Sequence, residues 1–360
     1  MDLDSELEAW LTLSLTPGLG DVHLRRLLVA FGGPQQVLAA SRAERLRVVP
    51  ESVAAALGTP VSHEQLRAVG VWLDDPANLL VTLGDSTYPQ ALLQIPDPPS
   101  VLYVKGRVDL LNHAAFAIVG SRNGTQQGIA HAEAFAHALS DAGLTIVSGL
   151  ALGIDAAAHR GGLAGASSSI AVVGTGLDIV YPARNRALAH ELAASGCIIS
   201  EFALGTPPVA TNFPRRNRLI SGLARGCLVV EAALASGSLI TARTANDQGK
   251  DVFAMPGSIH SPLAKGCHSL IKQGAKLAES AEDILEELGM LRVPPSTRAG
   301  ELPPENADSA LHAVGFEPCS IDGLATRTGL SAEKLATLLT QWEIEGLIEA
   351  LPGGRYQRVR

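Results

Sequence analysis

Arginine side chains cluster in one short stretch of the chain, residues 212–223. Arg215, Arg216 and Arg218 fall within four consecutive positions of the segment NFPRRNRLISGL, and no acidic residue occurs between its start and Val230. A guanidinium group binds phosphate through paired N–H donors. Pairing of these arginines with surface carboxylates is the alternative, but it agrees less well with their clustering. The stretch therefore predicts a local binding site for an anion.

Small residues form a second candidate element for anion binding. Glycine-containing turns follow the apolar runs, namely Gly120-Ser121-Arg122, Ser148-Gly149, Gly174-Thr175-Gly176 and Ser236-Gly237-Ser238. Glycine lets the backbone approach a ligand, and the start of a helix behind such a turn carries partial positive charge. Tight strand-to-helix turns alone are the alternative explanation for each glycine. That alternative explains poorly why the turns occur together with Arg122, Arg184 and Arg186.

Candidate catalytic residues are few. Glu201 and Glu231 each end an apolar run and could form a carboxylate pair for acid–base chemistry, or could orient the arginines. Asp155 and His159 are four residues apart on an expected helix, and without a third ligand this spacing favours local roles. We find no GxSxG motif, zinc pattern, Walker lysine or complete dinucleotide fingerprint. The sequence therefore nominates no catalytic residue, no metal site and no cofactor.

Apolar runs alternate with helical patterns across the middle of the chain. The expected strands are residues 115–120, 144–148, 169–173, 197–201, 227–231 and 252–255, and the expected helices are residues 126–141, 154–164, 184–195, 215–224, 238–248 and 265–273. This alternation predicts a doubly wound, mostly parallel sheet of the α/β class. Ligands of such sheets bind beyond the carboxyl ends of the strands. The glycine-containing turns and the arginines are expected at that edge.

The flanking regions suggest further domains. Residues 1–95 are expected to form a helical domain, 96–290 the α/β domain, 291–307 a Pro-rich linker and 308–360 a winged-helix domain. The turn at residues 16–20 is either a helix-hairpin-helix element that approaches nucleic-acid phosphates or a plain turn between helices. The third helix of the winged-helix region is acidic, which favours protein contact. Its wing carries Arg355, Arg358 and Arg360, which are candidates for duplex DNA.

Composition limits the classes of partner. Lys and Arg total 28 and Asp and Glu total 36, which gives a net charge of −8, so a polyanion must bind a local basic patch. The four cysteines are scattered, which argues against a disulfide framework. The acidic N-terminus and the lack of a long apolar run predict neither a signal peptide nor a membrane span. We expect a cytoplasmic protein without a membrane partner.

A resemblance to a known family rests on motifs that run in order from Ala117 to Gly257. These are AIVGSR (117–122), IVSGLALGID (146–155) with His159, GLD (176–178) with Tyr181-Pro182 and Asn185, FPRRNRLISGL (213–223), VEA (230–232) with SGSLITA (236–242), and MPG (255–257). With these motifs the sequence resembles the DNA-processing protein A family, also called the DprA or Smf family. The resemblance implies an extended Rossmann-like domain between a SAM-like helical domain and a winged helix.

The same resemblance implies a function. Members of that family bind single-stranded DNA, form homodimers and load the RecA recombinase onto DNA taken up in natural transformation, without a catalytic role. An enzyme that processes nucleotides or nucleic acids, as in the related nucleotide-binding Rossmann superfamily, is the alternative. The expected DNA-binding residues are Gly120, Ser121, Arg122, Gly149, Arg184, Asn185, Arg186, Asn212, Phe213, Arg215, Arg216, Asn217, Arg218, Ser236, Gly237, Ser238, Lys265 and Gly266.

Overall fold

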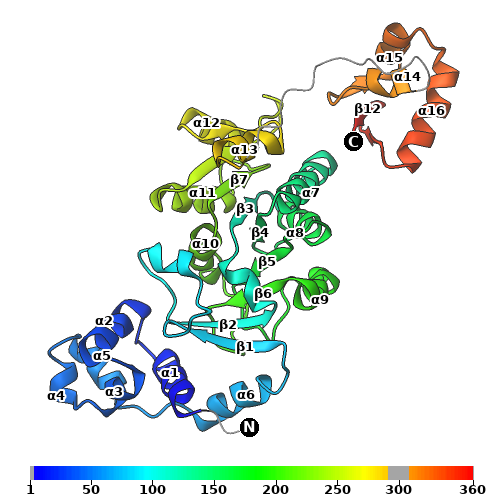
Figure 1. The fold of residues 1–360 in the computed structure, drawn as a ribbon. Helices are drawn as coiled ribbons and strands as arrows, with labels where there is room; N and C mark the ends of the chain where they lie inside the picture. The colour runs from blue at the N-terminus through cyan, green and yellow to red at the C-terminus, as the bar shows by residue number, and fades with distance from the viewer. Residues whose placement is uncertain (1–3, 291–307, 360) are drawn as a thin grey trace.

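The chain folds into a helical N-terminal part, a large α/β part and a small C-terminal part (Figure 1). The computed structural model describes residues 4–290 and 308–359. The expected Pro-rich linker at residues 291–307 and Arg360 lie outside the described residues. Within the described residues, no helix combines the length and apolar character needed to cross a membrane.

Six short helices form the N-terminal part. They are α1 (Ser5–Leu15), α2 (Asp21–Phe31), α3 (Pro34–Ala39), α4 (Arg42–Arg45), α5 (Glu51–Ala56) and α6 (His63–Trp72). Glycine and proline separate the first two helices, as residues that end helices should. A small core that includes Leu13, Leu24, Leu27 and Val53 holds α1, α2 and α5 together.

A nine-stranded sheet forms the centre of the α/β part. Its strands are β1 (Asn78–Thr82), β2 (Val101–Gly106), β3 (Ala115–Val119), β4 (Thr145–Ser148), β5 (Ser169–Val172), β6 (Cys197–Ser200), β7 (Gly226–Val229), β8 (Asp251–Ala254) and β9 (Lys276–Leu277). They lie in the order β1-β2-β6-β5-β4-β3-β7-β8-β9. The pairs from β6 to β9 are parallel, whereas β1 and β2 are added antiparallel at one edge.

Helices cover both faces of this sheet. The helices are α7 (Gln126–Asp141), α8 (Ile154–Ala164), α9 (Arg186–Ser195), α10 (Asn212–Leu223), α11 (Ser238–Asp247), α12 (Lys265–Lys272) and α13 (Ala281–Glu287), with 3-10 turns η1 (Gln90–Gln94), η2 (Val108–Asn112) and η3 (Ala183–Asn185). In β3, Phe116 and Ile118 pack towards α7 and α8, whereas Ala117 and Val119 pack towards α10 and α11. Because strands buried on both faces are apolar throughout, the continuous apolar runs of the sequence are explained.

The fold class expected from the sequence is confirmed. The six expected strands are β3 to β8, and the chain forms a mixed α/β fold with a mostly parallel central sheet and a C-terminal winged helix. Three strands, β1, β2 and β9, were not expected. The first of them begins at Asn78, inside the region expected to be helical, so the division of the chain at residue 95 stays a prediction.

The C-terminal part is a small helical unit with a three-stranded sheet. It contains α14 (Asp308–Ala313), β10 (Cys319–Ser320), α15 (Ile321–Thr328), α16 (Ala332–Ile344), β11 (Ile348–Leu351) and β12 (Arg355–Arg358). The strands lie in the order β10-β12-β11, and Leu324, Leu335, Leu339 and Trp342 form the core. Strands β11 and β12 make the antiparallel hairpin expected for the wing.

Candidate functional site

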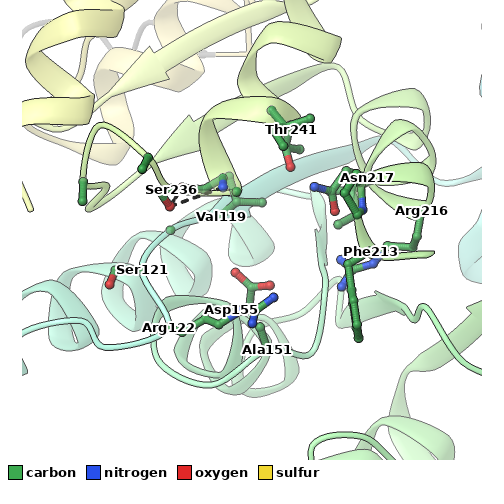
Figure 2. A pocket seen from close by; sticks show the side chains of 18 of the residues that line it. Val119, Ser121, Arg122, Ala151, Asp155, Phe213, Arg216, Asn217, Ser236 and Thr241 are labelled. Carbon is green, nitrogen blue, oxygen red and sulfur yellow. Dashed lines mark hydrogen bonds between the residues drawn. The ribbon is translucent and has the colours of Figure 1, made fainter. Parts of the chain in front are cut away.

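The parallel sheet changes winding direction between β3 and β7, and a cavity opens at that point. Strand β3 pairs with β4 on one side and with β7 on the other, so the loops after β3 and β7 diverge at the carboxyl edge. A cavity of about 770 Å³ lies there. Its lining comes from the loops after β3, β4 and β7 and from α10 and α11 (Figure 2). Such a switch point is where doubly wound sheets bind ligands.

Arg216 lies beneath one wall of this cavity. Its side chain is buried, and Nη2 donates a 2.9 Å hydrogen bond to the carbonyl oxygen of Gly149. A Cβ at Gly149 would stand 1.8 Å from Arg216 Nη1, so only glycine permits this approach. Burial lowers the pKa of Arg216 to about 10, a fall that Asp155 opposes. Arg216 therefore remains charged at neutral pH inside the protein.

Asp155 is the acidic partner of this wall. It is buried in the first turn of α8, and Oδ2 accepts a 3.2 Å hydrogen bond from the Gly149 N–H. Burial raises the pKa of Asp155 above its ordinary value, while Arg216 and backbone N–H donors act in the opposite direction. Asp155 also lines the cavity. The expected local role at the start of the helix agrees with this geometry.

The loop between β4 and α8 is held in an unusual conformation. Leu150 has a φ of 56°, a region that leucine rarely adopts. Its N–H donates to His159 Nε2 at 3.2 Å, and its carbonyl accepts from Asn185 Nδ2 at 2.9 Å. The same amide of Asn185 donates to Ala151 O at 3.1 Å. Asn185, an expected DNA contact, thus fixes the loop by bonds to its backbone.

His159 acts in this loop as a neutral acceptor. Because Nε2 accepts from Leu150, Nδ1 carries the hydrogen and donates to Ser169 Oγ at 2.7 Å. Burial lowers the pKa of His159 to about 3, and Arg216 and Arg160 add to the effect. The local role expected for His159 is confirmed.

Arg122 and two aromatic rings form the mouth of the cavity. The Arg122 guanidinium is exposed and lies 5.8 Å from the centre of the Phe213 ring. Phe213 also contacts Tyr181, at 5.7 Å between ring centres, and Tyr181 is 43% exposed. Among the residues that the structure describes, no carboxylate forms an ion pair with Arg122. The mouth therefore offers a free positive charge beside exposed aromatic surface.

The opposite wall comes from the start of α11. Ser236 and Ser238 share a 2.6 Å hydrogen bond between their hydroxyl groups, and Gly237 between them is exposed. These three residues line the cavity together with Asn217 from α10 (Figure 2). The start of α11 directs its N–H groups and partial positive charge to the same space.

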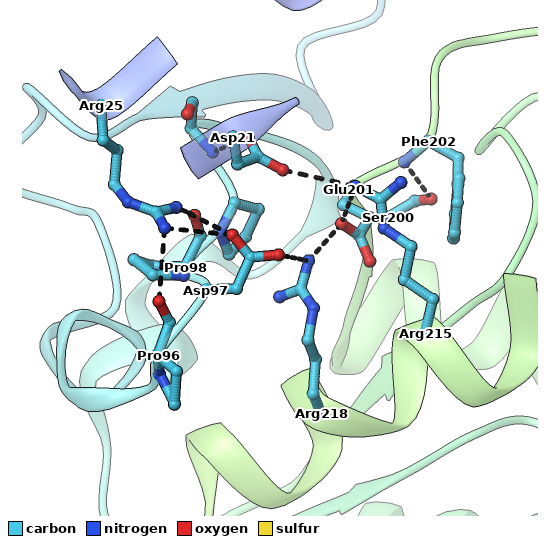
Figure 3. Close-up of polar contacts among 12 residues, drawn as sticks. Asp21, Arg25, Pro96, Asp97, Pro98, Ser200, Glu201, Phe202, Arg215 and Arg218 are labelled. Atoms are coloured by element: carbon cyan, nitrogen blue, oxygen red, sulfur yellow. Dashed lines mark hydrogen bonds and ion pairs between the residues drawn. The ribbon is translucent and has the colours of Figure 1, made fainter. Parts of the chain in front are cut away.

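Arg215 and Arg218 face away from this cavity, although Arg216 between them faces it. Arg218 Nη2 contacts Glu201 Oε2 at 2.5 Å, and Arg215 Nη2 contacts the same oxygen at 2.9 Å (Figure 3). Residues three apart lie on one side of a helix, so Arg215 and Arg218 point together. The idea that all three arginines face one groove is therefore wrong. A DNA contact by Arg215 or Arg218 stays a prediction.

Of the remaining residues expected to bind DNA, some are exposed and others form hydrogen bonds within the protein. Arg184 in η3 and Arg186 at the start of α9 are both exposed, beyond the carboxyl end of β5. Asn212 donates to Gly174 O at 3.2 Å. Lys265 donates to Ile259 O, and Gly266 N donates to Ala232 O at 2.8 Å, which fixes α12 to the loop after β7. Gly120 and Ser121 line the cavity beside Arg122.

The two glutamates considered for acid–base chemistry lie apart from the cavity lining. Glu201 is bound to arginine, as above. Glu231 accepts from the Thr125 N–H at 2.9 Å and from Thr125 Oγ1 at 2.6 Å, at the N-terminus of α7. Thr241 lines the cavity and was not singled out in the sequence. Thr241 could have been predicted to line the cavity, because it lies three residues after Ser238 on the same side of α11.

Two family models and several known proteins match this chain in sequence. The model of the family described as DNA recombination-mediator protein A matches residues 79–289, and a model of the DprA winged helix domain matches residues 294–354. Protein Smf from Escherichia coli is 44% identical over 298 residues, which cover 80% of this chain and 79% of that protein. The DNA processing protein DprA from Streptococcus pneumoniae is 47% identical over 203 residues, or 56% of this chain and 72% of that protein.

Two solved structures are similar as well. The X-ray structure of DNA processing protein A from Streptococcus pneumoniae has a TM-score of 0.67 at 36% identity and covers 80% of this chain and 99% of that one. The DNA processing protein A from Helicobacter pylori, described with a single-stranded DNA binding mode, has a TM-score of 0.54 at 31% identity. It covers 58% of this chain and 95% of that one.

Proposed function

Because this chain belongs to the DNA recombination-mediator protein A family, which includes the Smf and DprA proteins, we propose that it binds single-stranded DNA across the switch-point cavity. The observation that carries the proposal is Arg122, an exposed guanidinium beside Phe213 at the mouth of that cavity. The single-stranded DNA binding mode described for the Helicobacter pylori relative supports the same class of ligand.

The binding that we propose is dominated by phosphate. Arg122 and the start of α11 supply positive charge at the cavity, and the exposed Arg184 and Arg186 extend that charge along the same edge of the sheet. Phe213 and Tyr181 are placed to contact one or two bases. Contacts to the DNA backbone with few base contacts give no sequence specificity. Each phosphate that is bound adds to the salt dependence of the affinity.

We further propose that the protein acts without catalysis, as a homodimer that protects single strands and loads RecA recombinase in recombination and natural transformation. A loader must hold DNA of any sequence and release it, which suits a phosphate grip. The wing of the C-terminal part, with Arg355 exposed, is the proposed place for duplex DNA. RecA filament assembly on strands coated with a single-strand binding protein tests the loading: faster assembly with this chain is expected, and no effect would contradict it.

The experiment that tests DNA binding compares fluorescently labelled single-stranded and duplex oligonucleotides by anisotropy. The intact wild type should bind the single strand more tightly, and the double variant Arg122→Ala, Arg184→Ala should bind it at least about tenfold more weakly. Arg107→Ala removes an exposed arginine on the opposite edge of the sheet and should bind as the wild type does. Equal binding by all three proteins would contradict the proposal.

A further inference from the structure

A balanced network of three acids and three arginines joins α10 to the N-terminal helices. Arg215 contacts Asp21 of α2 at 3.3 Å and Glu201, at the end of β6, at 2.9 Å. Arg218 contacts Glu201 at 2.5 Å and Asp97 at 3.8 Å. Asp97 in turn accepts from Arg25 of α2 at 3.1 Å (Figure 3).

The network is also tied to the connector between the helical part and the sheet. Arg25 donates to Pro98 O at 2.6 Å, and Asp21 Oδ1 accepts from the Ser100 N–H at 2.9 Å. These bonds bring the start of α2, the connector at residues 96–100 and α10 to one place. Arg215 and Arg218 of α10 are thereby fixed to residues far away in the sequence.

Glu201 lies at the centre of this network. Its side chain is 1% exposed, and a single oxygen, Oε2, accepts from both Arg215 and Arg218. The other oxygen, Oε1, is buried without a hydrogen-bond partner among the described residues. Glu201 and Tyr103 both line a cavity of about 190 Å³ below the turn of residues 16–20. A carboxylate buried at such a junction strongly restrains its partners, because an unpaired charge there is unfavourable.

We infer that Glu201 is a positioning residue for the DNA site: it fixes the orientation of α10 and couples the N-terminal helices to DNA affinity. The inference rests on the proposed function. One side of α10 holds Arg215 and Arg218 on Glu201, and the other side presents Phe213 and Asn217 to the switch-point cavity. Because a helix of this length moves as a rigid unit, a shift on the first side displaces the second.

The sign of the mutational effect separates positioning from simple electrostatics. Glu201 is an anion near a site for a polyanion, so electrostatics alone predicts that its neutralisation strengthens DNA binding. Positioning predicts the reverse, because α10 loses its anchor. Coupling through one contact of this kind changes affinity by roughly two- to thirtyfold. The direction of the change is therefore decisive.

The test uses the full chain with Glu201→Gln, and Asp109→Asn as the control. Asp109 forms an exposed pair with Arg107 on the opposite edge of the sheet, and its substitution removes the same charge. Two quantities are measured, the Kd for a single-stranded oligonucleotide and the backbone hydrogen exchange of the free protein. We expect Glu201→Gln to raise the Kd roughly two- to thirtyfold and to speed exchange in α10 and α2 while β3 and β4 stay protected. Asp109→Asn should change neither quantity.

An equal or tighter Kd for Glu201→Gln, or unchanged exchange in α10, would overturn the inference. If Glu201→Gln does not fold, Asp97→Asn decides in its place. That substitution leaves Glu201 with both arginines and should shift the Kd and the α10 exchange in the same directions by less, whereas no shift in either would overturn the inference. Lack of DNA binding by the wild type would instead refute the proposed function, and the exchange of the free proteins would still test the anchor.

Discussion

The guanidinium of Arg216 occupies the space that a side chain at Gly149 would need. Nη2 donates to the Gly149 carbonyl at 2.9 Å, and the Gly149 N–H donates to Asp155. One glycine thus connects a buried cation to a buried acid through its own peptide groups. Arg216 and Asp155 both line the switch-point cavity, so this connection supports one of its walls.

Gly149→Ala should damage this wall. The added Cβ would stand 1.8 Å from Arg216 Nη1, so the guanidinium must move. We expect the free energy of unfolding to fall by about 1–3 kcal/mol, as for other overpacked sites, and DNA affinity to fall with it. Chemical denaturation and anisotropy measure the two effects. Gly84→Ala is the control, because its Cβ would meet only ordinary contacts at 3.7 Å. Equal stability of the two variants would contradict the geometry.

His159 should make the stability depend on pH. Its pKa falls from the ordinary value of 6.5 to about 3 in the folded protein, so below pH 6.5 the unfolded chain binds a proton that the native state does not. Stability is therefore lost as the pH falls through this window, by about 2 kcal/mol between pH 6.5 and 5.

The variant His159→Gln isolates this contribution, since glutamine can still accept from the Leu150 N–H and does not titrate. Urea denaturation of both proteins at several pH values gives the free energy of unfolding as a function of pH. The wild type should lose more stability than His159→Gln on acidification. Parallel curves for the two proteins would show that His159 is not the buried neutral acceptor.

Asn185→Asp should release the loop between β4 and α8. The substituted side chain keeps its shape but cannot donate to Leu150 O or Ala151 O, and it would place a charge against two carbonyl oxygens. We expect a loss of about 1–3 kcal/mol in the free energy of unfolding. Hydrogen exchange should rise locally in residues 149–153. If exchange there stays slow, the loop does not depend on Asn185.

Arg218→Met should destabilise the protein more than the loss of an exposed arginine does. Arg218 is 15% exposed and its partner Glu201 is 1% exposed, so the variant leaves a buried carboxylate with one arginine fewer. The expected cost is about 3 kcal/mol. Arg107→Met, which breaks an exposed pair with Asp109, should cost about 1 kcal/mol or less. Thermal and urea denaturation of the two variants measure these losses in the free energy of unfolding. Similar losses for Arg218→Met and Arg107→Met would indicate that Arg218 is effectively solvated.

The sequence predicted the central α/β architecture because apolar periodicity reports burial directly. The runs from Ala115 and Thr145 are buried on both faces, and helices α7 and α8 begin and end where the pattern changes. Strand β1 was missed because Asn78–Thr82 is short and follows a helical region, and its pairing with β2 depends on a partner about twenty residues away.

The residue types of the candidate site could be predicted from the sequence, but the directions of their side chains could not. Three neighbouring arginines indicated an anion site, yet side-chain direction on α10 depends on partners that are distant in the sequence. Glu201 directly follows β6 and Asp21 lies on α2, and only tertiary structure brings them to Arg215. Likewise, no local pattern shows that Gly149 makes room for Arg216. Charge clusters therefore reveal that a site exists, while long-range ion pairs decide which members remain free.

The salt dependence of single-stranded DNA binding by the wild type and Arg122→Ala tests the central claim most directly. Kd is measured for one labelled oligonucleotide across a range of NaCl concentrations. We predict a clear fall in affinity with salt for the wild type, and for Arg122→Ala weaker binding with a log–log slope reduced by about 0.7, the value for one phosphate contact on a single strand. Affinity that is independent of salt, or a slope and Kd unchanged by Arg122→Ala, would contradict a phosphate grip at the mouth of the switch-point cavity.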